Sequence, residues 1–233
     1  MTITAVQGIG VHVRAVTPTA ARAQADFRAL LNVLSRPGVL DAVGRTEGPP
    51  ALAVAAGLAD VEVPTAVLTA PGEEHWVRAL HLATSAPIAR PELARMVVAL
   101  RPPTAAEILA LTRGDALHPE HGTRLVAAVA DLSADLSADL SAELPAGPSA
   151  GPSAGPSAGP PREGHGTVLR LSGPGVPGTR RLRVAGLSTE VFAALISSNA
   201  DFPAGVDTFL VAADGTVAGL PRSTRIEIEN GEH

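Results

Sequence analysis

Lysine and cysteine, two residue types that carry much of enzyme chemistry, are absent from this 233-residue chain. Without cysteine the chain has no disulfide, no thiolate nucleophile and no iron–sulfur ligand. Without lysine it has no side-chain amine for a Schiff base. The lack of cysteine also fits a reducing compartment. These absences favour a scaffold subunit over a self-sufficient enzyme.

Aromatic residues are scarce as well, so the core must be built mainly from aliphatic side chains. The five aromatic residues are Phe27, Trp76, Phe192, Phe202 and Phe209. All 18 basic residues are arginine, which we attribute to codon bias in a GC-rich genome. The formal net charge of -5 disfavours nucleic acid and anionic membranes as partners, because both attract basic surfaces.

Long apolar runs are missing too. The best, ALAVAAGLA at 51–59, has about half of the roughly 18 residues that a membrane span needs. The opening MTITAVQGIG lacks the charged and apolar regions of a signal peptide. We therefore expect a cytoplasmic protein with no membrane partner. Its length and apolar content are sufficient for one domain, 1–233, with a substantial core.

A tetrapeptide tract runs from 130 to 161 as three ADLS, one AELP, three AGPS and one AGPP unit. The ADLS half is compatible with a short helix that places Leu132, Leu136, Leu140 and Leu144 in one stripe. The AGPS half is not, because proline at every fourth residue removes backbone donors. We predict an exposed low-complexity insertion at 131–164, flexible in its second half.

Elsewhere the pattern alternates between helices and strands. Phe27, Leu30, Leu31 and Leu34 have helical spacing, and this helix ends at Pro37–Gly38. Further helices are predicted at 48–59, 73–84, 104–113 and 187–198. Strands are predicted at 61–69, 95–100, 123–129, 167–172 and 180–185, and on both sides of the Asp-Gly turn at 214–215. This order predicts a three-layer α/β fold, a mixed sheet with helices on both faces.

Two glycine-containing patterns resemble catalytic or cofactor motifs. GPGVPG at 173–178 matches the dinucleotide-binding G-x-G-x-x-G and follows a predicted strand, but no helix follows it to receive a pyrophosphate. We predict a structural turn there. GPSAG around Ser149, Ser153 and Ser157 matches the nucleophile elbow of serine hydrolases, but lies in a proline-rich repeat without the required strand and helix.

Two polar clusters offer other chemistry. HPEH at 118–121 groups the ligand types of a divalent metal, yet its histidines are three residues apart and Pro119 marks a surface turn. Around the GPGVPG loop, Arg170, Arg180, Arg181 and Arg183 could bind a phosphate or phosphonate. The simpler interpretation places Arg181 and Arg183 on the wet face of a half-buried strand.

Four ordered segments resemble the PhnH family, the H subunit of the bacterial carbon–phosphorus lyase system. They are FRALLNVLSRPGV at 27–39, LRLSGPGV at 169–176, FPAGVD at 202–207 and GLPRSTRIEI at 219–228, with PEHGTRL at 119–125 collinear. The resemblance omits the tetrapeptide insertion and the first dozen residues. The matching fold or interface residues are Phe27, Arg28, Leu31, Ser35, Pro37, Gly38, Gly173, Pro174, Gly175, Phe202, Pro203, Gly205, Asp207, Pro221, Arg222 and Thr224.

The resemblance implies a fold like the large domain of pyridoxal-phosphate-dependent transferases, without that cofactor. It also implies a homodimer in isolation and a core complex with G, I and J subunits, in which this subunit pairs with J. That complex couples alkylphosphonates to the ribose of ATP, forming α-D-ribose 1-methylphosphonate 5-triphosphate from methylphosphonate. The radical step needs cysteine-ligated iron and sulfur, and so belongs to a partner chain. No catalytic, cofactor-binding or metal-ligating residue is predicted on this chain.

Two other classes of function stay open from the residues alone. One is a small metal-dependent hydrolase built on His118, Glu120 and His121. The other is a binding module that presents the tetrapeptide tract to a partner.

Overall fold

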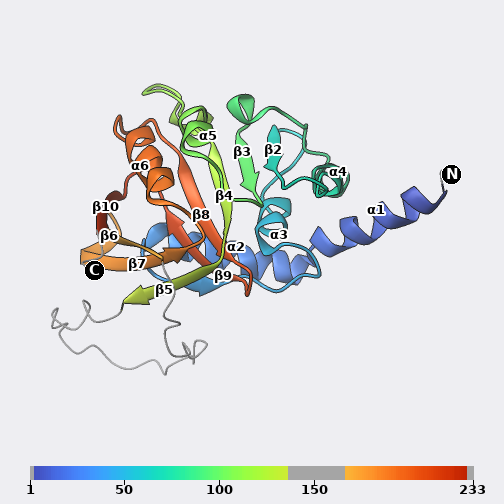
Figure 1. The fold of residues 1–233 in the computed structure, drawn as a ribbon, viewed down its shortest axis with the longest axis horizontal. Helices are drawn as coiled ribbons and strands as arrows, with labels where there is room; N and C mark the ends of the chain where they lie inside the picture. Colours follow the sequence, from blue (N-terminus) through green and yellow to red (C-terminus); the bar gives the residue numbers. More distant parts are fainter. Residues whose placement is uncertain (1–2, 136–165, 230–233) are drawn as a thin grey trace.

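The computed structural model describes residues 3–135 and 166–229 (Figure 1). The α-helices are α1 (Ile3–Val16), α2 (Ala20–Ser35), α3 (Pro50–Ala56), α4 (His75–Thr84), α5 (Ala105–Leu109) and α6 (Thr189–Ser198). The strands are β1 (Asp41–Ala42), β2 (Thr65–Leu68), β3 (Met96–Ala99), β4 (Arg124–Val129), β5 (Asp131–Asp135), β6 (Thr167–Gly173), β7 (Val176–Ala185), β8 (Asp207–Ala212), β9 (Thr216–Leu220) and β10 (Arg225–Glu229). Short 3₁₀ turns lie at Pro91–Leu93 and Pro119–His121.

The strands form two sheets. The first has six strands in the order β1-β9-β8-β4-β3-β2. Strands β2, β3, β4 and β8 are parallel, and β9 pairs antiparallel with both β8 and β1. The second has four antiparallel strands in the order β10-β6-β7-β5. The predicted mixed α/β class is therefore confirmed, and the second sheet was not foreseen as a separate layer.

Both faces of the six-stranded sheet are buried. On β3, Met96 and Val98 contribute to a core shared with α2, α3 and α4. Val97 and Ala99 contribute to the opposite core, which α5, α6 and the second sheet complete. Strands buried on both sides read as continuous apolar runs, as MVVA does here. Helices thus pack on both faces of this sheet, and the second sheet shares one face with them.

Strand β5 corrects the helix expected for the start of the ADLS tract. In ADLS, polar and apolar residues also alternate with period two, which is the pattern of a half-buried strand. Leu132 faces the core, where it is buried, and lies opposite Val184 of β7. The helical prediction is wrong at 131–135, and the predicted insertion begins inside a sheet. The rest of that insertion lies outside the described residues, as do Ser149, Ser153 and Ser157.

Helix α1 precedes the first predicted element and was missed. It extends away from the sheets toward the N-terminus (Figure 1) and contacts α4 and α3 near its C-terminal end. The His12 ring lies 4.3 Å from that of His75 and meets the Trp76 ring edge-on at 4.9 Å, centroid to centroid. Gly48 leaves room for this contact, since a Cβ there would lie 3.2 Å from Trp76. Aromatic packing therefore docks α1. No helix of the described residues has the length and apolarity of a membrane span.

We expect His12→Ala to loosen α1 and expose Trp76 to water. Trp76 is the only tryptophan, and the chain has no tyrosine, so intrinsic fluorescence reports on this contact alone. The emission should shift to longer wavelength, with a loss of about 1 kcal/mol in unfolding free energy from the lost ring contacts. His118→Ala, on a distant exposed turn, is the control and should leave the emission unchanged. Identical spectra for both variants would contradict the docking.

Candidate functional site

Three of the family-like segments meet at the guanidinium of Arg222. Its Nε donates to both carboxylate oxygens of Asp207 at 3.2 Å, and its Nη2 donates to Asp207 Oδ2 at 2.7 Å. Its Nη1 donates to the carbonyl oxygens of Pro119 at 2.5 Å and Pro203 at 3.3 Å. The two side chains are only 13% and 22% exposed. We call this the Arg222 unit, and it ties the PEHG, FPAGVD and PRST segments together.

Close backbone contacts complete the Arg222 unit. A Cβ on Gly122 would lie 2.4 Å from the carbonyl oxygen of Gly205, and a Cβ on Gly205 would lie 2.6 Å from Asn199 Oδ1. Asn199, at the end of α6, accepts a bond from the Val206 N–H at 2.7 Å and donates one to the Val206 carbonyl at 3.2 Å. Asn199 is not among the predicted site residues, because nothing in the sequence marks its pairing with a residue seven positions ahead.

The GPGVPG segment forms the turn between β6 and β7. Pro174 and Gly175 are its two turn residues, and Gly175 has a φ of +77°, in the left-handed region that glycine favours. Strand β7 begins at Val176, directly after the turn. The predicted structural turn is confirmed, and a strand stands where a dinucleotide site would need a helix N-terminus.

This turn packs against the C-terminal end of α2, where the RPG motif ends the helix. A Cβ on Gly175 would lie 2.1 Å from the carbonyl oxygen of Ser35, and one on Gly38 would lie 2.9 Å from Arg180 Cβ. Arg180 Nη1 donates to the carbonyl oxygens of Pro37 at 3.2 Å and Gly175 at 3.4 Å. The first two family-like segments are thus one contact, which we call the Gly175 junction.

The last motif links this junction to the Arg222 unit. Its turn is closed by the Thr224 N–H, which donates to the Pro221 carbonyl at 2.8 Å, and the Thr224 side chain is buried. Next to it, a Cβ on Gly173 would lie 3.2 Å from the Ser223 carbonyl oxygen. The buried motif residues therefore hold the two sheets together.

The candidate anion contacts lie on the exposed face of the second sheet. Arg170 Nη1 is 3.8 Å from Glu227 Oε2, and Arg181 Nε donates to Glu229 Oε1 at 3.0 Å. Arg181 and Arg183 are exposed, whereas Leu182 and Val184, which alternate with them, are buried. This alternation confirms the predicted solvent-exposed strand face. Strand β10, which was not predicted, supplies both glutamates. An incoming anion would have to compete with these carboxylates.

HPEH is an exposed 3₁₀ turn, as predicted. The rings of His118 and His121 stack with centroids 5.1 Å apart, and each lies near its own carboxylate: Asp115 at 3.5 Å and Glu120 at 3.7 Å. Among residues 3–135 and 166–229, no group of three or more His, Cys, Asp or Glu side chains is placed to hold a metal ion. The metal-hydrolase alternative gains no ligand set from this part of the chain.

Among the residues that the structure describes, the carboxyl group with the largest pKa shift belongs to a helix cap. Hydrogen bonds from Arg101, at 2.6 and 3.0 Å, lower the pKa of Glu107 from 4.5 to about 2, and the Thr104 backbone adds to the effect. Thr104 and Glu107 form a capping box at the start of α5. The shift therefore has a structural cause.

Because its pKa is lowered on folding, ionised Glu107 stabilises the fold above pH 4.5, and this contribution is lost as the pH falls toward 2. The side chains of Arg101 and Glu107 are 33% and 29% exposed, so solvent screens the pair. Glu107→Gln should cost about 1 kcal/mol at pH 7 and almost nothing at pH 2. Urea unfolding at both pH values measures this difference. An equal cost at both would show that the charge is not the cause.

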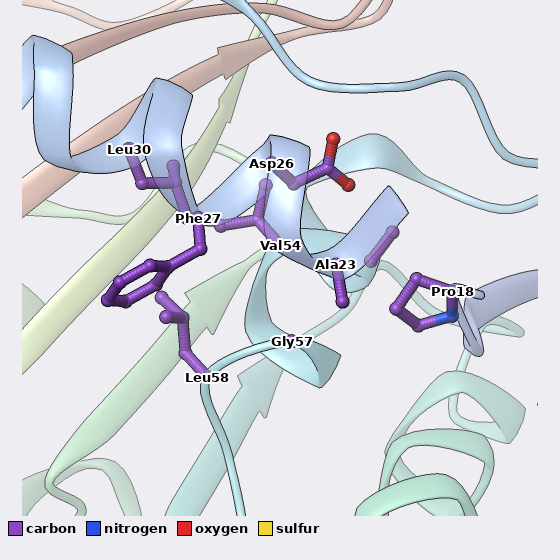
Figure 2. Close-up of a pocket in the computed structure, with 9 residues that line it drawn as sticks. Pro18, Ala23, Asp26, Phe27, Leu30, Val54, Gly57 and Leu58 are labelled. Carbon is purple, nitrogen blue, oxygen red and sulfur yellow. The ribbon is translucent and has the colours of Figure 1, made fainter. Parts of the chain in front are cut away.

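Three large apolar motif side chains instead face outward. Phe27 and Leu31 on α2 are 50% and 51% exposed, and Phe202 is 64% exposed. Phe27 also borders a hollow between α2 and α3, where its ring lies beside Leu58 (Figure 2). The hollow is shallow and open to solvent: it has room for about one water molecule, which is far less than a ligand pocket needs.

The fold and its motif residues define a mixed α/β protein. Its buried motif arginine, Arg222, bonds Asp207 and the chain's own backbone, and its large exposed motif side chains include Phe27, Leu31 and Phe202. The sequence profile of the family described as "Bacterial phosphonate metabolism protein (PhnH)" matches residues 15–152 and 154–227. The chain therefore belongs to the PhnH family. The match begins at the end of α1, so most of that helix lies outside it.

A curated relative is named "Putative C-P lyase subunit protein HtxG", from Stutzerimonas stutzeri. It is 42% identical over 72 residues, which is 31% of this chain and 36% of the relative. The matched part thus spans about a third of that protein's length.

Proposed function

We propose that this chain is a non-catalytic subunit of the carbon–phosphorus lyase complex of phosphonate catabolism. In this role it supports formation of α-D-ribose 1-methylphosphonate 5-triphosphate from ATP and methylphosphonate. The observation that carries the proposal is the family match over most of the chain, and the name of the HtxG relative agrees with it. The lack of lysine and cysteine supports a structural role.

The hydrogen bonds of the polar motif residues also support a structural role in a complex over a catalytic role. Arg222 directs its donors to Asp207 and two backbone carbonyls, and Arg180 bonds the carbonyls at the Gly175 junction. Guanidinium groups that recognise a phosphate or phosphonate use the same donors. These two arginines therefore direct donors to the backbone of this chain.

The proposed partners are the G, I and J subunits in the cytoplasm, with pairing to J, and a homodimer in isolation. We also propose a likeness to the large domain of pyridoxal-phosphate-dependent transferases, whose cofactor-binding lysine this chain lacks. Within the single domain, the tetrapeptide tract beyond β5 is proposed as an insertion. The radical step falls to a partner, because it needs cysteine ligands.

Co-expression with the G, I and J proteins of the same genome tests the proposal. A tag on the G protein should recover this chain in a fixed ratio to the others after size-exclusion chromatography. A chain that elutes alone, while G, I and J assemble without it, would overturn the proposal.

A further inference from the structure

The outward face of α2 combines an apolar edge with a basic flank. The edge consists of Phe27 and Leu31, one turn apart, and borders the hollow that Ala23 and Leu58 help to line (Figure 2). We call the edge and the hollow the α2 surface. Exposed motif side chains of this size bury well only against another surface, and aromatic residues are frequent anchors of protein interfaces.

The exposed charged residues on α2 and at its C-terminal cap are all arginine. Arg28 and Arg36 are exposed on the flank beyond Leu31, and Arg36 bonds Asn32 within the helix. The only acid of α2, Asp26, lines the hollow but is buried: its carboxylate pairs with Arg22 Nε at 3.3 Å and accepts the Gly44 N–H at 2.8 Å. The exposed part of α2 therefore presents arginine and no carboxylate.

We propose that the α2 surface docks a partner protein chain through an apolar side chain that packs against Phe27 and Leu31 and carboxylates that face Arg28. Complementary charge sets the choice of partner at such a rim. A second copy fits less well, because a two-fold contact through this face would place Arg28 near its own equivalent. This inference rests on the proposed function and makes another subunit of the phosphonate complex the occupant.

The test uses the complex co-expressed with the G, I and J proteins and two variants of this chain. Phe27→Asp places a carboxylate at the edge of the hollow, and Arg28→Glu reverses the basic flank at an exposed position. Each should reduce the recovered chain by about tenfold or more, as for the loss of an interface anchor. Leu82→Asp, at a helical leucine that is also 50% exposed, is the matched control and should assemble normally.

The possible outcomes separate the surface from the function. Assembly of the wild type and of both α2 variants would overturn the α2 surface and leave the proposed function standing. Failure of the wild type to assemble would overturn both. Sedimentation of the isolated chain tests whether a second copy binds the surface instead. If the isolated chain is a dimer and Phe27→Asp or Arg28→Glu converts it to a monomer, the surface binds a second copy and the proposal is wrong. Unchanged circular dichroism of Arg28→Glu excludes misfolding as the cause.

Discussion

Gly175→Ala should destabilise the protein by about 3–4 kcal/mol. The new Cβ would lie 2.1 Å from the Ser35 carbonyl oxygen, a distance that forces α2 and the hairpin apart. Such overpacking costs about 1–3 kcal/mol, and the φ of +77° adds roughly 1–2 kcal/mol for a residue with a side chain. At about 2–4 °C per kcal/mol, the melting temperature should fall by roughly 6–15 °C.

Gly178→Ala is the matched control in the same hairpin. Gly178 also has a positive φ, of +68°, but a Cβ there would meet no atom within 4 Å. This variant should lose only the roughly 1–2 kcal/mol of backbone strain. Differential scanning calorimetry of both proteins measures the contrast. Equal melting temperatures would mean that the close approach to Ser35 does not stabilise the fold.

Arg222→Ala should have an effect of similar size, about 3 kcal/mol. It leaves Asp207 without its paired cation, removes the Arg222 donor from the Pro203 carbonyl, and leaves the Pro119 carbonyl with the Gly122 N–H at 3.1 Å. Removing one member of a buried pair costs about 3–5 kcal/mol, and partial exposure places this pair at the lower end. Arg222→Lys should recover only part of the loss, because an ammonium cannot fork between a carboxylate and two carbonyls.

A second arginine of the same region provides the control. Arg113 lies 4.0 Å from Asp201, and their side chains are 47% and 81% exposed. Exposed pairs of this kind contribute about 0–1 kcal/mol. Arg113→Ala should therefore change urea unfolding little. If it destabilised the chain as much as Arg222→Ala, the Arg222 unit would not be the link between the motif segments.

Elements with strong local patterns could be predicted from the sequence. The helix with Phe27 and Leu34 ends at the predicted RPG stop, and both strands around the Asp-Gly turn are present. Short elements that depend on their neighbours were missed. Strand β1 has two residues and exists by pairing with β9, and β10 exists by pairing with β6. Their stability comes from ladder partners distant in the chain.

The ADLS tract shows why one period can mislead. Leucine at every fourth residue fits a drifting helical stripe, and the same letters fit a strand with leucine and alanine on one face. The free edge of β7 decides between them, since β5 completes its hydrogen bonds and buries Leu132. Such a tertiary choice lies outside any local window.

The family resemblance identifies the residues of the candidate site, but it does not say which of them hold the fold and which could contact a partner. The motif residues fall into three groups with different surroundings: the Gly175 junction, the Arg222 unit, and the exposed side chains of Phe27, Arg28, Leu31 and Phe202. Only their positions in space separate residues that hold the fold from residues offered to a partner. Two of the arginines suspected of binding an anion, Arg170 and Arg181, face glutamates of β10, a strand that local patterns did not reveal.

Growth on a phosphonate tests the central claim most directly. The gene for this chain would be deleted in the organism that encodes it, and growth measured with methylphosphonate or phosphate as the sole source of phosphorus. We expect no growth on methylphosphonate, normal growth on phosphate, and recovery when the wild-type chain is supplied. Undiminished growth of the deletion strain on methylphosphonate would contradict a role in the carbon–phosphorus lyase complex.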